Sequence, residues 1–219
     1  SEDSFDIVIV GAGFAGMYML YKLRSMGLNT RVYERGDGVG GTWYWNRYPG
    51  ARCDLESMEY SYSFDNDLQQ EWNWKEKYGT QPELLKYANH VADRFDLRRD
   101  IEFKTRLNSA HYNDVTGRWD LTTNRGSRAT AAHLVLATGN LSTPQPPKID
   151  GVADFNGRSF HTGNWPHVNV DFRKRRVGII GTGSSAVQAI PEIAKQAAHL
   201  TVFQRTANFS IPAHHGPLE

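Results

Sequence analysis

Cysteine is nearly absent from this sequence, as are long hydrophobic runs and any excess of charge. Among 219 residues, Cys53 is the single cysteine, so the chain cannot form an internal disulfide, which suits a reducing compartment. The longest apolar stretch, residues 7–20, is interrupted by glycines and is too short to span a bilayer. A net charge of +1 gives no reason to expect attraction to nucleic acid or to an anionic membrane. These features predict a cytoplasmic protein without nucleic-acid or membrane partners.

A buried strand leads directly into a glycine-rich turn near the N-terminus. Residues 5–10 form a continuous, β-branched apolar run, which is typical of a strand covered on both faces. The turn Gly11-Ala12-Gly13-Phe14-Ala15-Gly16 follows, then a helical pattern to about Met26 and a second strand over residues 30–34. The segment therefore predicts a β-α-β unit.

The glycine spacing in this turn indicates a dinucleotide site. Gly11 permits the tight turn, Gly13 lets the backbone approach a pyrophosphate, and Gly16 allows the helix to pack closely on the strand. The N–H groups at the helix N-terminus attract phosphate, and Glu34 can accept a hydrogen bond from a ribose 2′-OH. The alternative is an ordinary tight turn in an α/β core, but strand, turn, helix and acid all agree with nucleotide binding.

A second unit of the same kind begins at residue 176. A strand over residues 176–180 leads into Gly181, Gly183 and Ala186, with a helix expected to about Ala198. The next strand ends at Arg205 and Thr206, where the first unit has an acid. An arginine pairs with a 2′-phosphate that a carboxylate would repel, so the pattern favours NADPH over NADH; the alternative is a solvated arginine. We expect FAD in the first unit and NADP(H) in the second, with hydride passing between them.

The remaining elements complete an α/β fold with two Rossmann-like dinucleotide-binding domains. We expect a long loop over residues 36–73, a helix from Thr80 to about Phe95, short strands near 101–106, 108–114 and 117–123, and a buried strand at 133–139. The expected domains are an FAD-binding domain (1–141), a linker (142–170) and the first β-α-β unit of an incomplete NADP-binding domain (171–219). No histidine or cysteine spacing suits a metal site.

Residues 155–166 carry a more specific pattern, F-x-G-x-x-x-H-T-x-x-W-P. This segment resembles the fingerprint of the Baeyer–Villiger monooxygenases. The related N- and S-oxidising flavin-containing monooxygenases have tyrosine where Trp165 stands and do not require Thr162. The stretch from Gly40 to Asp54 is similar to the flavin-facing loop of the family, and residues 71–74 resemble its phenylacetone and steroid monooxygenase group.

The resemblance implies a set of contacts for each cofactor. Together with the glycine turn, it implies that the flavin cofactor is bound by Gly11, Gly13, Phe14, Ala15, Gly16, Glu34, Gly41, Thr42, Trp43, Tyr44, Trp45, Asp54, Tyr60 and the backbone of Leu107. NADP(H) would be bound by Arg52, Cys53, Asp54, Gly181, Thr182, Gly183, Ser184, Ser185, Ala186, Val187, Gln188, Arg205 and Thr206.

Two residues have further implied roles. Asp54 would support catalysis by pairing with an active-site arginine that lies beyond this chain; the alternative is an aspartate that only caps a loop. His161 would couple domain movements at a hinge rather than take part in chemistry, and the alternative is a core histidine with satisfied hydrogen bonds.

The activity that the resemblance implies is a Baeyer–Villiger oxidation. An enzyme of this family uses FAD and NADPH to insert one atom of O2 beside a ketone carbonyl, giving an ester or lactone. Family members are more than twice as long as this chain, so we expect the remainder of the enzyme to follow C-terminally. The alternatives are an N- or S-oxidising monooxygenase and a cofactor-binding fragment without turnover.

Overall fold

The structure, a computed structural model, describes residues 3–218 and divides into two compact units. One unit comprises the chain up to Tyr44 together with Leu85–Ser142; the other comprises Trp45–Leu84 together with the chain from Thr143 onward. Residues 45–84, expected in the FAD-binding domain, thus group with the C-terminal segment. Ser1 and Glu219, the outer ends of the expected domains, lie outside the described residues.

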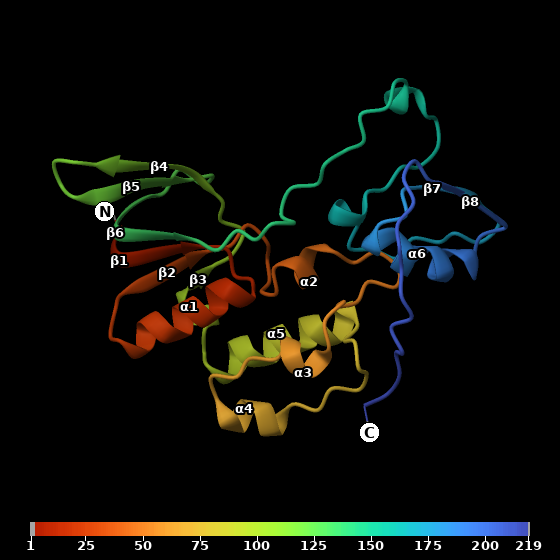
Figure 1. Cartoon of the computed structure of the whole chain (residues 1–219). Helices are drawn as coiled ribbons and strands as arrows, with labels where there is room; N and C mark the ends of the chain where they lie inside the picture. Colours follow the sequence, from red (N-terminus) through yellow and green to blue (C-terminus); the bar gives the residue numbers. More distant parts are fainter. Residues whose placement is uncertain (1–2, 219) are drawn as a thin grey trace. The chain divides into compact units, whose positions relative to one another are not determined.

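The first unit is built on a six-stranded mixed sheet in the order β3-β2-β1-β6-β5-β4 (Figure 1). The parallel strands are β1 (Asp3–Val10), β2 (Thr30–Tyr33), β3 (Ile101–Glu102) and β6 (Arg128–Leu136); β5 (Arg118–Thr123) and β4 (Leu107–Asn113) continue it in antiparallel fashion. Helix α1 (Phe14–Ser25) connects β1 to β2. Since β2 and β6 flank β1 on opposite sides, the carboxyl end of β1 is the kind of switch point at which open α/β sheets bind ligands.

Burial on both faces explains the apolar run over residues 7–10 of β1. Ile9 lies in a core with Met17 of α1 and with Ala88 and Ala92 of α5 (Gln81–Arg94). On the other face, Val8 packs in a core cluster with residues of β5 and β6, including Leu121 and Ala131, and with Tyr33. The two faces hold β1, and with it the glycine turn, in a fixed place.

The second unit contains the parallel pair β7 (Arg176–Ile180) and β8 (His199–Phe203), joined by α6 (Ser184–Ala194). Its other short elements are α3 (Ser57–Tyr60), α4 (Asn66–Glu71), η2 (Val152–Asp154) and η3 (Thr162–Asn164); α2 (Thr42–Trp45) spans the boundary between the units, and η1 (Arg98–Asp100) belongs to the first unit. Trp165, Phe172 and Ile193 form part of its core.

The predicted fold class is confirmed: the chain is α/β with Rossmann-like units. Three predicted elements had the wrong bounds. The strand expected at residues 133–139 is β6, which starts at Arg128 and ends at Leu136 because it pairs with β1 over this stretch, and it is only partly buried. Helix α6 ends at Ala194 rather than Ala198, because the Gln196 amide closes a tighter turn on the Ile193 carbonyl and the Ala198 amide bonds to the Arg175 carbonyl instead of to the helix. The strand expected over residues 101–106 stops at Glu102, because Lys104 has a φ of 55° and donates its amide to a loop carbonyl. Over residues 3–218, the longest and most apolar helices fall short of what a membrane crossing needs.

Candidate nucleotide-binding sites

The turn from Gly11 to Gly16, here called the first cradle, requires glycine on steric grounds. Gly11 has a φ of 105°, and its amide donates to the Tyr33 carbonyl at 2.9 Å. A Cβ on Gly11 would lie 2.6 Å from the Ala137 carbonyl oxygen, and a Cβ on Gly16 would overlap the Gly11 carbonyl oxygen. Close packing of β1, β6 and α1 therefore fixes both glycines.

Gly13 and Gly41 allow two backbone segments to approach each other closely at the N-terminus of α1. Gly41 has a φ of 54°, and a Cβ there would lie 2.8 Å from the Gly13 Cα. Gly13 caps α1 without a side-chain hydrogen bond, and the first turn of the helix carries no acidic residue. No side chain of α1 or of its N-cap residue thus occupies the positive end of the helix dipole, which suits a phosphate group.

Glu34 ties the end of β2 to the first cradle. Its side chain is buried, with a residue exposure of 5%. One carboxylate oxygen accepts from the Ala12 amide at 2.8 Å and the other from the Gly36 amide at 2.6 Å. Each oxygen has a second lone pair, so these bonds leave Glu34 able to accept from a ribose hydroxyl.

The other expected flavin-contacting residues fall in both units. Trp43 and Tyr44 are buried in the first unit, where the Tyr44 hydroxyl donates to the Asp37 carboxylate. Leu107 starts β4 beside a register shift, and such bulges leave backbone groups outside the strand ladder, often near ligands. Ala15 and Thr42 also belong to the first unit, whereas Trp45, Asp54 and Tyr60 belong to the second.

The turn from Gly181 to Ala186, here called the second cradle, repeats the geometry of the first. Gly181 has a φ of 103°, and its amide donates to the Phe203 carbonyl at 2.8 Å. Gly183 caps α6 with a φ of −72°, close to the −77° of Gly13. A Cβ on Gly181 or Gly183 would meet no atom within 4 Å among the described residues.

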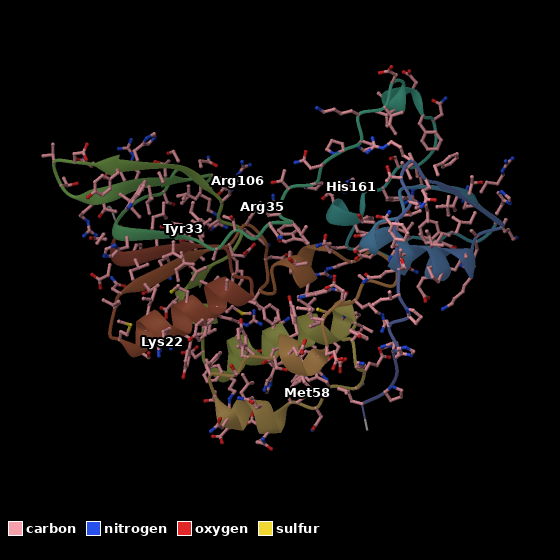
Figure 2. All side chains as sticks on the ribbon, in the orientation of Figure 1. Lys22, Tyr33, Arg35, Met58, Arg106 and His161 are labelled. Carbon is pink, nitrogen blue, oxygen red and sulfur yellow. The ribbon has the colours of Figure 1, made fainter. Side chains whose placement is uncertain are left out.

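The repeat identifies a residue that the motif analysis missed. Because the first glycine of each cradle bonds to the last residue of the following strand, Tyr33 corresponds to Phe203. The next residues then correspond as well: Glu34 to Gln204 and Arg35, labelled with Tyr33 in Figure 2, to Arg205. An alignment of the two β-α-β units, residue by residue, would have shown that Gln204 stands at the position of Glu34.

Gln204 replaces a carboxylate by a neutral amide at the end of β8. Its Nε2 donates to the Thr182 Oγ1 at 2.9 Å, and the Asn208 Nδ2 donates to the same oxygen at 2.8 Å. Arg205 and Thr206 follow directly and are exposed. The amide removes the repulsion that a carboxylate would exert on a 2′-phosphate, and Arg205 can add attraction.

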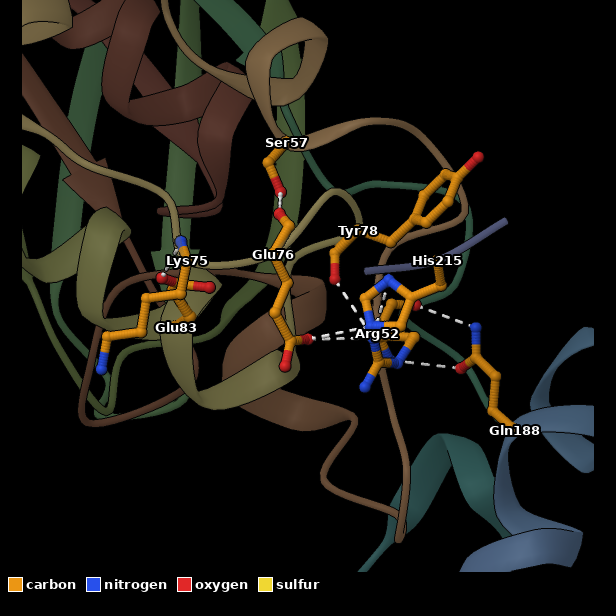
Figure 3. A network of polar contacts seen from close by, with 8 residues as sticks. All are labelled: Arg52, Ser57, Lys75, Glu76, Tyr78, Glu83, Gln188 and His215. Carbon is orange, nitrogen blue, oxygen red and sulfur yellow. Dashed lines mark hydrogen bonds and ion pairs between the residues drawn. The ribbon is translucent and has the colours of Figure 1, made fainter. Parts of the chain in front are cut away.

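The segment Arg52–Asp54 lies in the same unit as the second cradle. Figure 3 shows the polar contacts of Arg52. The Arg52 Nη1 contacts a carboxylate oxygen of Glu76 at 3.1 Å and the His215 Nε2 at 2.6 Å. Cys53 is buried, and burial raises the pKa of its thiol, with a smaller contribution from the nearby Asp54 charge. Cys53 is therefore a protonated, packed side chain near neutral pH, while Asp54 is exposed.

His161 and Trp165 have structural partners within the second unit. The His161 Nδ1 accepts from the Gly163 amide at 3.1 Å, and its Nε2 lies 3.1 Å from the Gln145 carbonyl oxygen. An acceptor at Nδ1 and a carbonyl at Nε2 require the tautomer with hydrogen on Nε2. Trp165 is buried against Phe160 and Phe172. The segment thus joins the preceding linker to the core of this unit.

The arrangement of both cradles suits the pyrophosphate of a dinucleotide. Each cradle offers backbone amides at the start of a helix of ten or more residues, and glycines occupy the positions where a side chain would crowd an approaching pyrophosphate. Within residues 3–218, no group of three or more His, Cys, Asp or Glu side chains could hold a metal ion.

The chain matches a protein family along nearly its whole length. Residues 8–215 match the family described as pyridine nucleotide-disulphide oxidoreductase. A Baeyer-Villiger monooxygenase from Pseudooceanicola batsensis is 52% identical over 97% of this chain and 39% of its own length. A phenazine N-monooxygenase from Lysobacter antibioticus is 49% identical over 95% of this chain and 39% of its own length.

Solved structures agree with these sequence matches. An oxidised steroid monooxygenase bound to NADP has a TM-score of 0.93 and 58% identity, covering 99% of this chain and 41% of the steroid monooxygenase chain. The described chain thus corresponds to about two fifths of the length of the proteins it matches.

Proposed function

Because the chain belongs to the pyridine nucleotide-disulphide oxidoreductase family, we propose that it forms the FAD- and NADPH-binding part of a Baeyer–Villiger monooxygenase. The observation that carries this proposal is the pair of cradles with the same backbone geometry and different chemistry. The first is closed by the Glu34 carboxylate, and the second by the Gln204 amide with Arg205 beside it. The 52% identity to a Baeyer-Villiger monooxygenase supports the reaction class.

We propose that the expected site residues bind the cofactors as follows. FAD would be held by Gly11, Gly13, Phe14, Ala15, Gly16, Glu34, Gly41, Thr42, Trp43, Tyr44, Trp45, Asp54, Tyr60 and Leu107. NADPH would be held at its nicotinamide end by Arg52, Cys53 and Asp54. Its phosphates and ribose would be held by Gly181, Thr182, Gly183, Ser184, Ser185, Ala186, Val187, Gln188, Arg205 and Thr206. Bound FAD supplies oxygen activation with electrons from NADPH.

The protein's own residues would bind and orient these groups. The amides of each cradle would neutralise pyrophosphate charge, and the Glu34 carboxylate would accept from a ribose hydroxyl. Asp54 lies on an exposed loop from which it could pair with an arginine of the remaining enzyme, C-terminal to this chain. His161, with both ring nitrogens bonded to backbone, would transmit movement rather than protons. A ketone and O2 would be the substrates, and the cytoplasm the location.

Disulfide chemistry, which the family name includes, is not supported by the residues of this chain. Reduction of a disulfide needs a thiol pair, and the sequence contains Cys53 alone. That thiol is buried, and burial raises its pKa.

N-oxidation is the second candidate function. It is favoured by the 49% identity to a phenazine N-monooxygenase. Thr162 and Trp165 instead follow the Baeyer–Villiger pattern, so we place N-oxidation second.

Product analysis of the full-length protein tests the proposal. The FAD-loaded protein is incubated with NADPH, isotopically labelled O2 and either a cyclic ketone or a phenazine, and the products are identified by mass spectrometry. We expect a lactone carrying one labelled oxygen. An N-oxide without any lactone would establish the second candidate. Stoichiometric flavin without NADPH-dependent oxygen uptake would contradict both and leave a cofactor-binding protein.

A further inference from the structure

One side chain of helix α6 joins the loop before Asp54 to the second cradle. The Gln188 Oε1 accepts from the Tyr48 hydroxyl at 2.8 Å and from the Arg52 backbone amide at 3.2 Å. The Gln188 Nε2 donates to the Arg52 backbone carbonyl at 3.0 Å. Gln188 therefore pairs with both backbone groups of Arg52, as a neighbouring strand would (Figure 3).

This pairing requires a primary amide of the right length. An amide offers an acceptor and a donor on adjacent atoms, whereas a carboxylate offers only acceptors. A glutamate at position 188 would place an oxygen against the Arg52 carbonyl oxygen and lose the donated hydrogen bond. A methionine would have a similar length and neither strong hydrogen bond.

Neighbouring residues hold the loop directly against the helix. Gly50 has a φ of 77°, and a Cβ at this position would overlap the Gln188 backbone carbonyl oxygen. Ser185, one helical turn before Gln188 and on the same helix face, lies beside the Tyr48 hydroxyl. The contact thus has close backbone packing as well as hydrogen bonds.

The Arg52 side chain is fixed independently of its backbone. Its guanidinium contacts Glu76 at 3.1 Å, the Tyr78 carbonyl at 3.3 Å and His215 at 2.6 Å. Because the backbone is held by Gln188 and the side chain by these three groups, Arg52 has little freedom to turn. The next two residues, Cys53 and Asp54, start from this fixed point.

We propose that Gln188 is a positioning residue that holds the segment Arg52–Asp54 on the second cradle. This inference rests on the proposed function, in which the cradle binds the phosphates of NADPH and Arg52–Asp54 faces its nicotinamide. Gln188 then links the two ends of one nucleotide site. The nicotinamide-facing segment follows the second cradle in any movement, although it precedes that cradle by more than a hundred residues in sequence.

The test compares Gln188→Met with the matched control Gln196→Met in the full-length holoenzyme. Gln196 lies just beyond the end of the same helix and is exposed. Hydrogen exchange of the peptide containing Arg52, measured without NADPH, reports whether the Arg52 backbone is hydrogen-bonded to Gln188. Rapid-mixing absorbance reports flavin reduction by NADPH, with its limiting rate and Kd, and dithionite serves as a chemical reductant that needs no nucleotide.

We expect Gln188→Met to speed exchange at the Arg52 amide and to slow the limiting rate of reduction by NADPH about tenfold or more, because small misplacement of reacting groups is costly. Reduction by dithionite should not change, and Gln196→Met should match the parent in both assays. Gly50→Ala, which displaces the loop without altering the Gln188 side chain, should reproduce the slower reduction and provides a second variant if Gln188→Met is poorly folded.

Two outcomes would overturn the proposal. Unchanged exchange at Arg52 with a weaker Kd alone would make Gln188 a nucleotide ligand only. Faster exchange with no change in the limiting rate would make it a structural residue without a positioning role. A parent enzyme whose flavin NADPH cannot reduce would instead refute the proposed function. The exchange measurement would still report on the contact between Gln188 and the Arg52 backbone.

Discussion

The buried Glu34 carboxylate accepts a hydrogen bond from the Ala12 amide, 2.8 Å away across the carboxyl edge of the sheet. This bond links the second residue of the glycine turn to the residue that follows β2. In the second cradle, Gln204 makes the equivalent connection to the Thr182 side chain. In both units the residue directly after the second strand thus also holds the turn expected to recognise the phosphates.

Replacing Glu34 by alanine should therefore lower both stability and flavin content. The variant leaves the Ala12 amide without its acceptor, at a cost of about 1–3 kcal/mol for a buried donor. Flavin-to-protein ratio by absorbance and the free energy of unfolding by urea titration measure the two effects. Glu102→Gln, at the end of the adjacent strand β3, is the control and should retain flavin. Full flavin content in Glu34→Ala would contradict the assigned role.

Gly16→Ala and Gly183→Ala should have different consequences. The first adds a Cβ that overlaps the Gly11 carbonyl oxygen, whereas the second adds one with no described atom within 4 Å. We expect Gly16→Ala to lose at least about 1–3 kcal/mol of stability, as overpacked cores do. Gly183→Ala should bind NADPH more weakly, because its Cβ would lie where a pyrophosphate approaches the backbone. Thermal unfolding and NADPH titration check the pair, and unchanged NADPH affinity in Gly183→Ala would contradict the role assigned to the second cradle.

Arg205→Ala should weaken the binding of NADPH far more than that of NADH. Loss of a hydrogen bond to a charged group costs about 1.5–3 kcal/mol, which corresponds to roughly 10- to 100-fold in Kd. NADH lacks the 2′-phosphate, so its affinity should change little. Titration of the full-length enzyme with both nucleotides measures the ratio, and Arg173→Ala, whose partner is the exposed Asp171, is the control. Equal weakening of both nucleotides would remove the phosphate assignment.

Cys53 should react slowly with thiol reagents in the folded protein. The thiolate is the reactive form, and burial raises the pKa of Cys53 above its ordinary value. Modification should therefore accelerate only at more alkaline pH than for an exposed cysteine, and unfolding in urea should abolish the protection. Mass spectrometry of alkylated protein as a function of pH measures this. Rapid labelling of the native protein at neutral pH would contradict the packed position.

The sequence predicted the cradles well because their requirements are local. Gly16 is fixed by the Gly11 carbonyl within one strand–turn–helix unit, and the glycine spacing identified both residues, although Gly11 is also fixed by Ala137 at the end of β6. Gln204 was missed because the known dinucleotide motifs have an acidic or a basic residue at the end of the second strand, and not an amide. The grouping of residues 45–84 with the C-terminal segment was not foreseen, since it depends on distant contacts such as Gln188 with Arg52. The early end of the strand at Glu102 depends on the left-handed conformation of Lys104, which no residue type announces.

The interleaving of the two units limits how the polypeptide can be divided. A chain cut after residue 141 would keep residues 45–84 but lose every partner that they have from residue 143 onward, including Gln188. Tyr48 and the backbone of Arg52 would then lose their hydrogen bonds to Gln188 and bond to water instead, and Gly50 would lose its packing against α6. The first nucleotide unit, expressed by itself, is therefore expected not to fold unless residues 45–84 are removed and Tyr44 is joined to Leu85.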